Sequence, residues 1–155
     1  MKRMEHIVIS IVCVSMILAF CACGVKAPPV PPSRVEPERV DDLSVTKGAE
    51  GAFLSWTVPT TNTDGSTLTD LAGFSVLRRD VADEDLDCPP CTGNFEKVYE
   101  FTLDAPGRAL VEGDDIAFED TSLSAGITYT FVVVPFNADG YTGPYSNPID
   151  VYFGR

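Results

Sequence analysis

The sequence predicts an all-β sandwich of two sheets between Val40 and Phe153. In this region, short runs of alternating apolar and polar residues are separated by Gly, Pro, Asn and Asp, which is typical of strands joined by turns. No stretch shows the periodicity of an amphipathic helix. The chain is 45% hydrophobic and 10% aromatic, which is enough to bury one core. A two-layer β-sandwich is consistent with all three observations.

Seven strands are expected in this region. The clearest is 52–58, in which alternation places Leu54 and Trp56 on one face and the only tryptophan between the two sheets. Seven strands in about 110 residues match the count of immunoglobulin-like domains. The expected strand ranges are 42–46, 52–58, 73–79, 95–103, 116–119, 128–137 and 147–153.

Two motifs make the strand pattern more specific. The first is Leu54-Ser55-Trp56, and the second combines Leu123, Gly126 and Tyr129 with the turn at 137–140. They resemble the second strand, the tyrosine corner and the F–G loop of fibronectin type III domains. The resemblance implies that Tyr129 buries its ring and hydrogen-bonds back to the turn, where Gly126 supplies backbone freedom. Structural roles are therefore expected for Trp56, Leu123, Gly126 and Tyr129.

Residues 1–22 have the three-part plan of a secretory signal peptide. Lys2 and Arg3 precede an unbroken apolar or small run over 7–20, and small residues follow. A signal peptide is removed from the mature protein. The alternative is an uncleaved transmembrane helix over 7–25, which is just long enough to span a bilayer. Both alternatives keep Lys2 and Arg3 inside and place the rest of the chain outside the cytoplasm.

The end of this segment, Phe20-Cys21-Ala22-Cys23-Gly24, resembles a lipobox, although Phe20 stands where the family usually has leucine. The resemblance implies that Cys23, which follows the small Ala22, carries diacylglycerol and a further acyl chain such as palmitate. Several acyl chains give stable membrane anchoring. Gly24 resembles the sorting pattern of Gram-negative bacteria. A lipid-anchored protein of the outer membrane is therefore expected, on its periplasmic or surface face.

Residues 23–39 are expected to form a lipidated cysteine and a proline-rich linker to the domain at 40–155. Five prolines between Lys26 and Arg39 exclude helix and central strand. An extended linker rising about 3.1 Å per residue would hold the domain roughly 40 Å from the membrane. A spacer is favoured over a proline-recognition ligand. Residues 23–28 are also similar to small lipoproteins that assist lipopolysaccharide export, which implies an alternative function through the lipidated N-terminus.

Charge and histidine content exclude several function classes. The formal net charge of −12 becomes −13 when residues 1–22 are removed, so nucleic acid would be repelled. The only histidine, His6, lies in the predicted signal peptide, which excludes histidine-dependent nucleophiles and imidazole-bound metals from the mature chain. A carboxylate cluster follows residue 113, but its spacing defines no glycosidase cleft. No enzyme, cofactor or metal is expected. The cluster comprises Asp114, Asp115, Glu119 and Asp120.

The connection over 80–94 is long for this fold and contains Cys88 and Cys91. In an oxidising compartment, two cysteines this close are expected to form a local disulfide. A redox role is disfavoured because the surrounding charge is negative. The acidic residues at 83–87 offer oxygen ligands for Ca²⁺, but the absence of EF-hand spacing favours a solvated loop.

An apolar stripe is expected on the outward face of one sheet. If Tyr129 points inward, Val132 and Val134 point outward, and Leu77 does the same on the neighbouring strand. Either the 80–94 loop covers this stripe or a partner docks on it. The expected function is a binding or scaffolding module that contacts an envelope protein or polysaccharide. The candidate binding residues are Leu77, Val132, Val134, Asp139, Gly140 and Tyr141.

Overall fold

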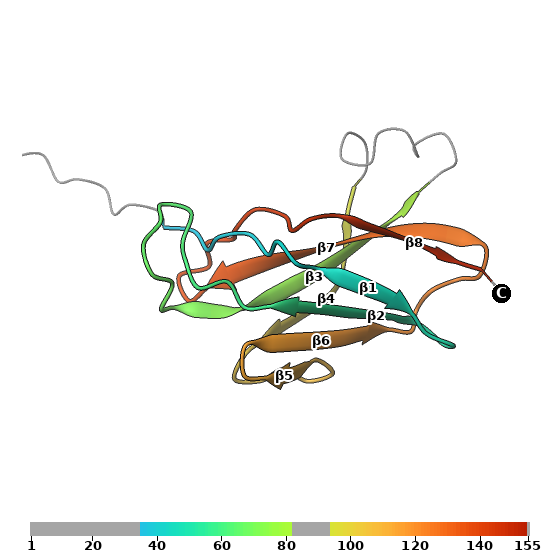
Figure 1. Cartoon of the computed structure of the whole chain (residues 1–155), viewed down its shortest axis with the longest axis horizontal. Coiled ribbons are helices and arrows are strands. Elements are labelled where there is room, and N and C mark those ends of the chain that lie inside the picture. The colour runs from blue at the N-terminus through green and yellow to red at the C-terminus, as the bar shows by residue number, and fades with distance from the viewer. Residues whose placement is uncertain (1–34, 82–93, 155) are drawn as a thin grey trace, which may run out of the picture. The chain divides into compact units, whose positions relative to one another are not determined.

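The computed structural model describes residues 35–81 and 94–154, which form two antiparallel sheets of four strands each (Figure 1). The strand orders are β1-β2-β6-β5 and β4-β3-β7-β8, so the predicted all-β sandwich is confirmed. These two ranges contain no helix long and apolar enough to cross a membrane. The strands are β1 (Ser44–Lys47), β2 (Ala52–Thr57), β3 (Leu71–Val81), β4 (Glu96–Thr102), β5 (Leu110–Glu112), β6 (Asp115–Asp120), β7 (Ile127–Asn137) and β8 (Ile149–Phe153).

Strict alternation in β2 forms one side of the core. Leu54 and Trp56 are buried, whereas Ser55 and Thr57 are exposed, because successive side chains in a strand point to opposite faces. The Trp56 ring packs edge-on against Phe74 of β3, with ring centroids 5.5 Å apart. Edge-to-face packing of this kind adds to the gain from area burial. The tryptophan therefore joins the two sheets as the alternation predicts.

A second aromatic stack closes the sandwich between β4 and β6. Tyr99 lies parallel to Phe118, with ring centroids 4.7 Å apart, and also stacks on Phe101. The Tyr99 hydroxyl donates to the carbonyl of Pro106 and accepts from the Arg108 amide at 2.8 Å. These contacts hold the segment that crosses from β4 to β5.

The turn before β7 is held by a tyrosine and an ion pair. The Tyr129 hydroxyl accepts a hydrogen bond from the Ser124 amide at 2.9 Å, and Gly126 has a φ of +87° that glycine adopts without strain. Arg78 donates to the largely buried carboxylate of Asp120 at 2.6 Å, and its guanidinium lies 4.9 Å from the Tyr129 ring centroid. Asp120 therefore joins the two sheets and does not belong to an open carboxylate cluster.

The described residues contain one strand more than the seven expected. β5 has only three residues, too few for alternation to be visible in the sequence. It forms a hairpin with β6 through Gly113, whose φ of +64° permits the tight turn. The extra strand widens the β1-β2-β6-β5 sheet and supplies one wall of the hollow described below.

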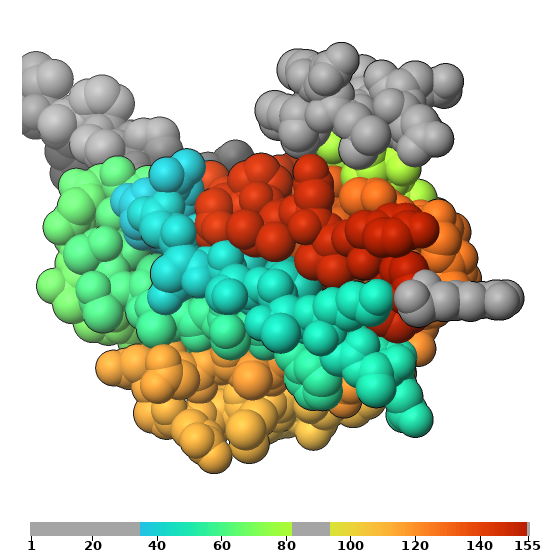
Figure 2. Space-filling model, turned by 45° about the vertical axis from the view of Figure 1, so that its right-hand side comes forward, coloured from blue at the N-terminus to red at the C-terminus, as the bar shows by residue number. Residues whose placement is uncertain are grey.

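The folded body includes residues before Val40. Residues 35–43, here named the strap, lie against the body, and Pro37 within it is fully buried. Asn147 fixes the strap by accepting from the Leu43 amide at 3.0 Å and donating to the Leu43 carbonyl at 2.9 Å. Figure 2 shows the strap between the chain around residue 65 and the chain around residue 145. Proline suits this edge position because it has no N–H to leave unpaired.

Candidate functional site

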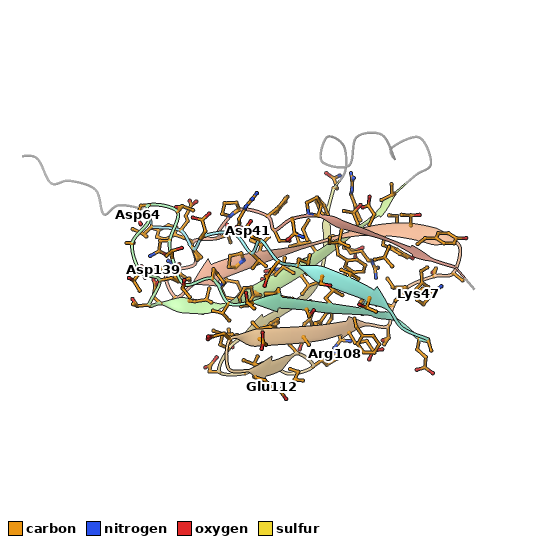
Figure 3. All side chains as sticks on the ribbon, in the orientation of Figure 1. Asp41, Lys47, Asp64, Arg108, Glu112 and Asp139 are labelled. Atoms are coloured by element: carbon orange, nitrogen blue, oxygen red, sulfur yellow. The ribbon has the colours of Figure 1, made fainter. Side chains whose placement is uncertain are left out.

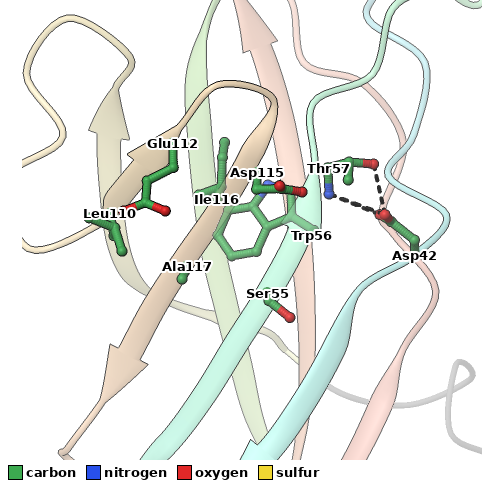
Figure 4. A pocket seen from close by; sticks show the side chains of 9 residues that line it. All are labelled: Asp42, Ser55, Trp56, Thr57, Leu110, Glu112, Asp115, Ile116 and Ala117. Atoms are coloured by element: carbon green, nitrogen blue, oxygen red, sulfur yellow. Dashed lines mark hydrogen bonds between the residues drawn. The ribbon is translucent and has the colours of Figure 1, made fainter.

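The outward face of the β1-β2-β6-β5 sheet is hollowed at its centre (Figure 4). Small side chains lie opposite one another across three strands: Ser44 pairs with Ser55, and Ser55 with Ala117. The row continues to Leu110, whose side chain is 56% exposed. Because neither Ser55 nor Ala117 fills the space above the sheet, a hollow of about 270 Å³ remains.

Carboxylates form one end of this hollow. Thr57, Asp115 and Glu112 lie in the adjacent cross-strand row. Asp42 accepts hydrogen bonds from the Thr57 amide at 3.1 Å and from the Thr57 hydroxyl at 2.7 Å, which fixes its carboxylate at the rim. The hollow therefore combines a floor of small residues with an anionic end.

Glu112 and Asp115 face each other directly across the β5–β6 hairpin, and both are exposed. Neither takes part in an ion pair within the described ranges. Like charges placed directly opposite in an antiparallel pair repel each other and destabilise it. The hairpin thus presents two uncompensated negative charges to solvent.

A second hollow of about 400 Å³ lies between the strap and the segment after β2, at 58–61. Asp42 and Thr57 line both hollows, so the two adjoin. Arg39 is the cation in this lining, and it forms an ion pair with Asp41. We name the two hollows together the acidic trough. Its carboxylates are Glu38, Asp41, Asp42, Glu112 and Asp115.

Trp56 lies beneath the trough. Its side chain is 2% exposed, and its Nε1 is buried without a hydrogen-bond acceptor among the described residues. Figure 4 shows the indole below the floor, with its nitrogen at the Asp115 end of the ring. A buried N–H without an acceptor is costly, and this one lies on the core side of the sheet, opposite the open face that carries the trough.

The stripe expected on the other sheet is not exposed. Val132 and Val134 are 2% and 6% exposed, and Leu77 is half-buried. The three do lie side by side, because Leu77 pairs with Val132 and the next outward residue, Ser75, pairs with Val134. Both valines are therefore buried side chains of the domain. A binding role for these residues remains an untested prediction.

The surroundings of this stripe are polar and ordered. Thr130, fully buried, donates to Asp150 at 2.7 Å, and Arg79 lies 5.6 Å from the Phe95 ring centroid. At the rim, Glu100 accepts hydrogen bonds from Lys97 and from Ser75, which lower the pKa of its carboxyl group.

The loop tip after β7 was also predicted to bind. Asp139 and Gly140 are exposed, and Tyr141 is half-buried. Asn137 closes the turn: its carbonyl accepts from the Gly140 amide at 3.0 Å, and its Oδ1 accepts from the Tyr141 amide at 2.9 Å. The loop is a tight turn that presents the exposed carboxylate of Asp139, and its binding role stays a prediction.

Three predicted residues, Cys23, Cys88 and Cys91, lie outside the described residues. The trough was not predicted from the sequence, although Asp115 belonged to the carboxylate cluster noted there. One signal was available: the outward positions Ser55 and Ala117 are small. That signal has meaning only once the register of β2 and β6 is known.

Comparison with known proteins supports the fold. No family model and no curated protein matches the sequence. Solved structures do match at low identity. The third fibronectin III domain of the human KIAA0343 protein has a TM-score of 0.52 and 16% identity, over 85% of this chain and 94% of that one. The chicken CNTN1 FN1–FN3 domains have a TM-score of 0.51 and 17% identity, over 78% of this chain.

The twitchin kinase region from C. elegans also matches, with a TM-score of 0.51 and 17% identity over 77% of this chain. The matched part spans only 17% of that chain, and 33% of the chicken protein. At these identities the likeness establishes the fold alone, which is that of a fibronectin type III domain.

Proposed function

We propose that the protein is an envelope lipoprotein, anchored through Cys23, that presents its fibronectin type III domain as a binding or scaffolding module. The observation that carries this proposal is the order of features at the N-terminus: Lys2 and Arg3, an apolar run, and Ala22 before Cys23. The partner is a protein or polysaccharide of the envelope. Gly24 after the cysteine favours the outer membrane.

The strap supports this arrangement. Asn137 donates to the Val35 carbonyl at 3.1 Å, so the chain joins the body at the end that carries the 138–141 loop. With residues 35–43 docked, eleven residues separate Cys23 from the body. An extended tether of that length reaches about 34 Å. A short tether and a fixed attachment point together limit how the module is oriented at the membrane.

A non-enzymatic role is part of the proposal. The solved structures that match include chains made up of fibronectin type III domains, and a mature chain without histidine lacks the commonest general base. The hollows on the surface are shallow and open, whereas small-molecule catalytic sites are usually enclosed. These features favour recognition of a macromolecular surface.

Acylation is the direct test. Cells that express the full chain are grown with labelled palmitate, alongside Cys23→Ser and the matched control Cys21→Ser. We expect label on the wild type and on Cys21→Ser but not on Cys23→Ser, and a mature chain whose first residue is Cys23. An intact, unacylated N-terminus on the wild type would overturn the proposal.

A further inference from the structure

We propose that the acidic trough binds an extended, lysine- or arginine-rich segment of a partner protein. This inference names the class of partner that the proposed binding module recognises. It rests on the proposed function, which places the module and its partner together in the cell envelope.

The shape of the trough fits an extended chain. Its floor is part of an antiparallel sheet, where Ser55 and Ala117 leave room above the backbone. The two hollows adjoin at Asp42 and Thr57 and together run from the strap to β5. A compact ligand would fill one hollow, whereas an extended segment occupies both.

The charge of the trough selects a cationic partner. Five carboxylates line it, and the single lining guanidinium, Arg39, is paired with Asp41. Figure 3 shows Asp64 and Asp139 at the end of the sandwich where the strap begins, with Lys47 at the other end. A surface lined by one sign of charge attracts the opposite sign and accelerates association.

The β5–β6 hairpin gives the most specific position for a cation. Glu112 and Asp115 repel each other across the strand pair and have no ion-pair partner among the described residues. An ammonium or guanidinium group between them replaces repulsion by two attractions. Binding at this point therefore relieves a cost already present in the free protein.

One further feature favours a peptide over a simple cation. The Leu110 side chain is 56% exposed at the edge of the hollow and offers an apolar surface to the methylene stem of lysine or arginine. A metal ion makes no such apolar contact, and the described residues contain no group of three acidic, histidine or cysteine ligands that could hold one.

Binding is measured with the full chain in detergent micelles. The probe is a nonapeptide of alternating lysine and serine, and its glutamate counterpart is the control peptide. Trp56 is the only tryptophan, and its backbone lies in the strand that forms the floor of the trough, so its fluorescence provides a signal for binding there. We expect saturable binding of the lysine peptide that weakens as salt rises from about 20 to 200 mM, because exposed charges are then screened.

Two variants test the location. Glu112→Gln with Asp115→Asn removes the repulsion without adding bulk, so it should fold normally and weaken binding about five- to ten-fold. The matched control, Glu50→Gln with Glu96→Gln, removes the same charge at exposed positions away from the trough and should change affinity by less than about two-fold. Ala117→Lys, which fills the floor with a cation, should abolish binding.

Several outcomes would overturn the inference: no binding of the lysine peptide, equal binding of the glutamate peptide, or equal losses in the trough and control variants. Binding of a neutral dextran oligosaccharide in place of the lysine peptide would identify a glycan site instead. Because peptide binding in micelles does not require acylation, this test and the palmitate test fail independently.

Discussion

The outward faces of the two sheets differ although both belong to strands with similar apolar content. On the β1-β2-β6-β5 sheet, buried and exposed residues alternate along β2, and the exposed ones are Phe53, Ser55 and Thr57. On the β4-β3-β7-β8 sheet, β7 is buried on both faces over residues 129–135. Alternation therefore identifies an open face, and an unbroken apolar run identifies a covered one. The open face is the one available to a partner.

The largest expected effect comes from placing the same lysine on each face. Val132→Lys puts an unpaired charge at a site that is 2% exposed, and should lower the free energy of unfolding by about 3 kcal/mol or more. Ser55→Lys places the charge among the trough carboxylates and should change stability by less than about 0.5 kcal/mol. Urea unfolding of both variants measures the difference. Equal losses of unfolding free energy in the two variants would mean that the outward faces of the two sheets are equally buried.

The next effect concerns the strap, which forms one wall of the open face. Asn147→Ala removes both hydrogen bonds to Leu43 and leaves its amide and carbonyl without these partners. We expect a loss of about 1–3 kcal/mol. Amide exchange should also be faster at Leu43 than in the wild type, whereas exchange at Val133 should change little. An unchanged Leu43 exchange rate would show that Asn147 does not hold the strap.

A similar loss is expected at the turn before β7. Tyr129→Phe leaves the Ser124 amide without its acceptor, and should cost about 1–2 kcal/mol while the ring remains packed. Thermal unfolding measures the change. Tyr152→Phe is the control, because the Tyr152 side chain is 62% exposed, and should have no measurable effect. A neutral Tyr129→Phe would contradict a structural role for the hydroxyl.

The smallest effect is a pH dependence at the rim of the covered face. Hydrogen bonds from Lys97 and Ser75 lower the pKa of Glu100, so their contribution is present above the unfolded pKa and is lost as pH falls through the lower, folded pKa. Both Lys97 and Glu100 are about half exposed, so solvent reduces the energy to a few tenths of a kcal/mol. Carboxyl NMR titration should find the Glu100 pKa below the ordinary value of a glutamate side chain. A Glu100 pKa above that value would contradict the contact.

The local sequence pattern was sufficient to predict the fold but not the candidate functional site. Alternation at Leu54 and Trp56, and the spacing of Gly126 and Tyr129, specify strands and a turn that the structure contains. β5 could not be predicted because three residues show no period. The docking of residues 35–39 depends on partners such as Thr61, whose carbonyl accepts from the Glu38 amide across a long stretch of sequence. Such contacts leave no local signal.

The trough shows the same limit. Its acidic residues were visible as a cluster, but Asp120 turned inward to pair with Arg78, whereas Asp115 remained on the surface beside Glu112. Only the strand register separates these roles. The register also brings Ser55 and Ala117 together, and their small size creates the space. A site that forms because small side chains leave a hollow is difficult to predict from residue types alone.

The contrast between the two faces is tested most directly by NMR chemical-shift mapping of the full chain with the lysine–serine peptide. We predict shifts at the amides of Ser55, Thr57 and Ala117 on the open face, and none at Thr130, Val132 and Val134 on the covered face. Shifts confined to the second group would contradict the assignment of the open face as the binding surface.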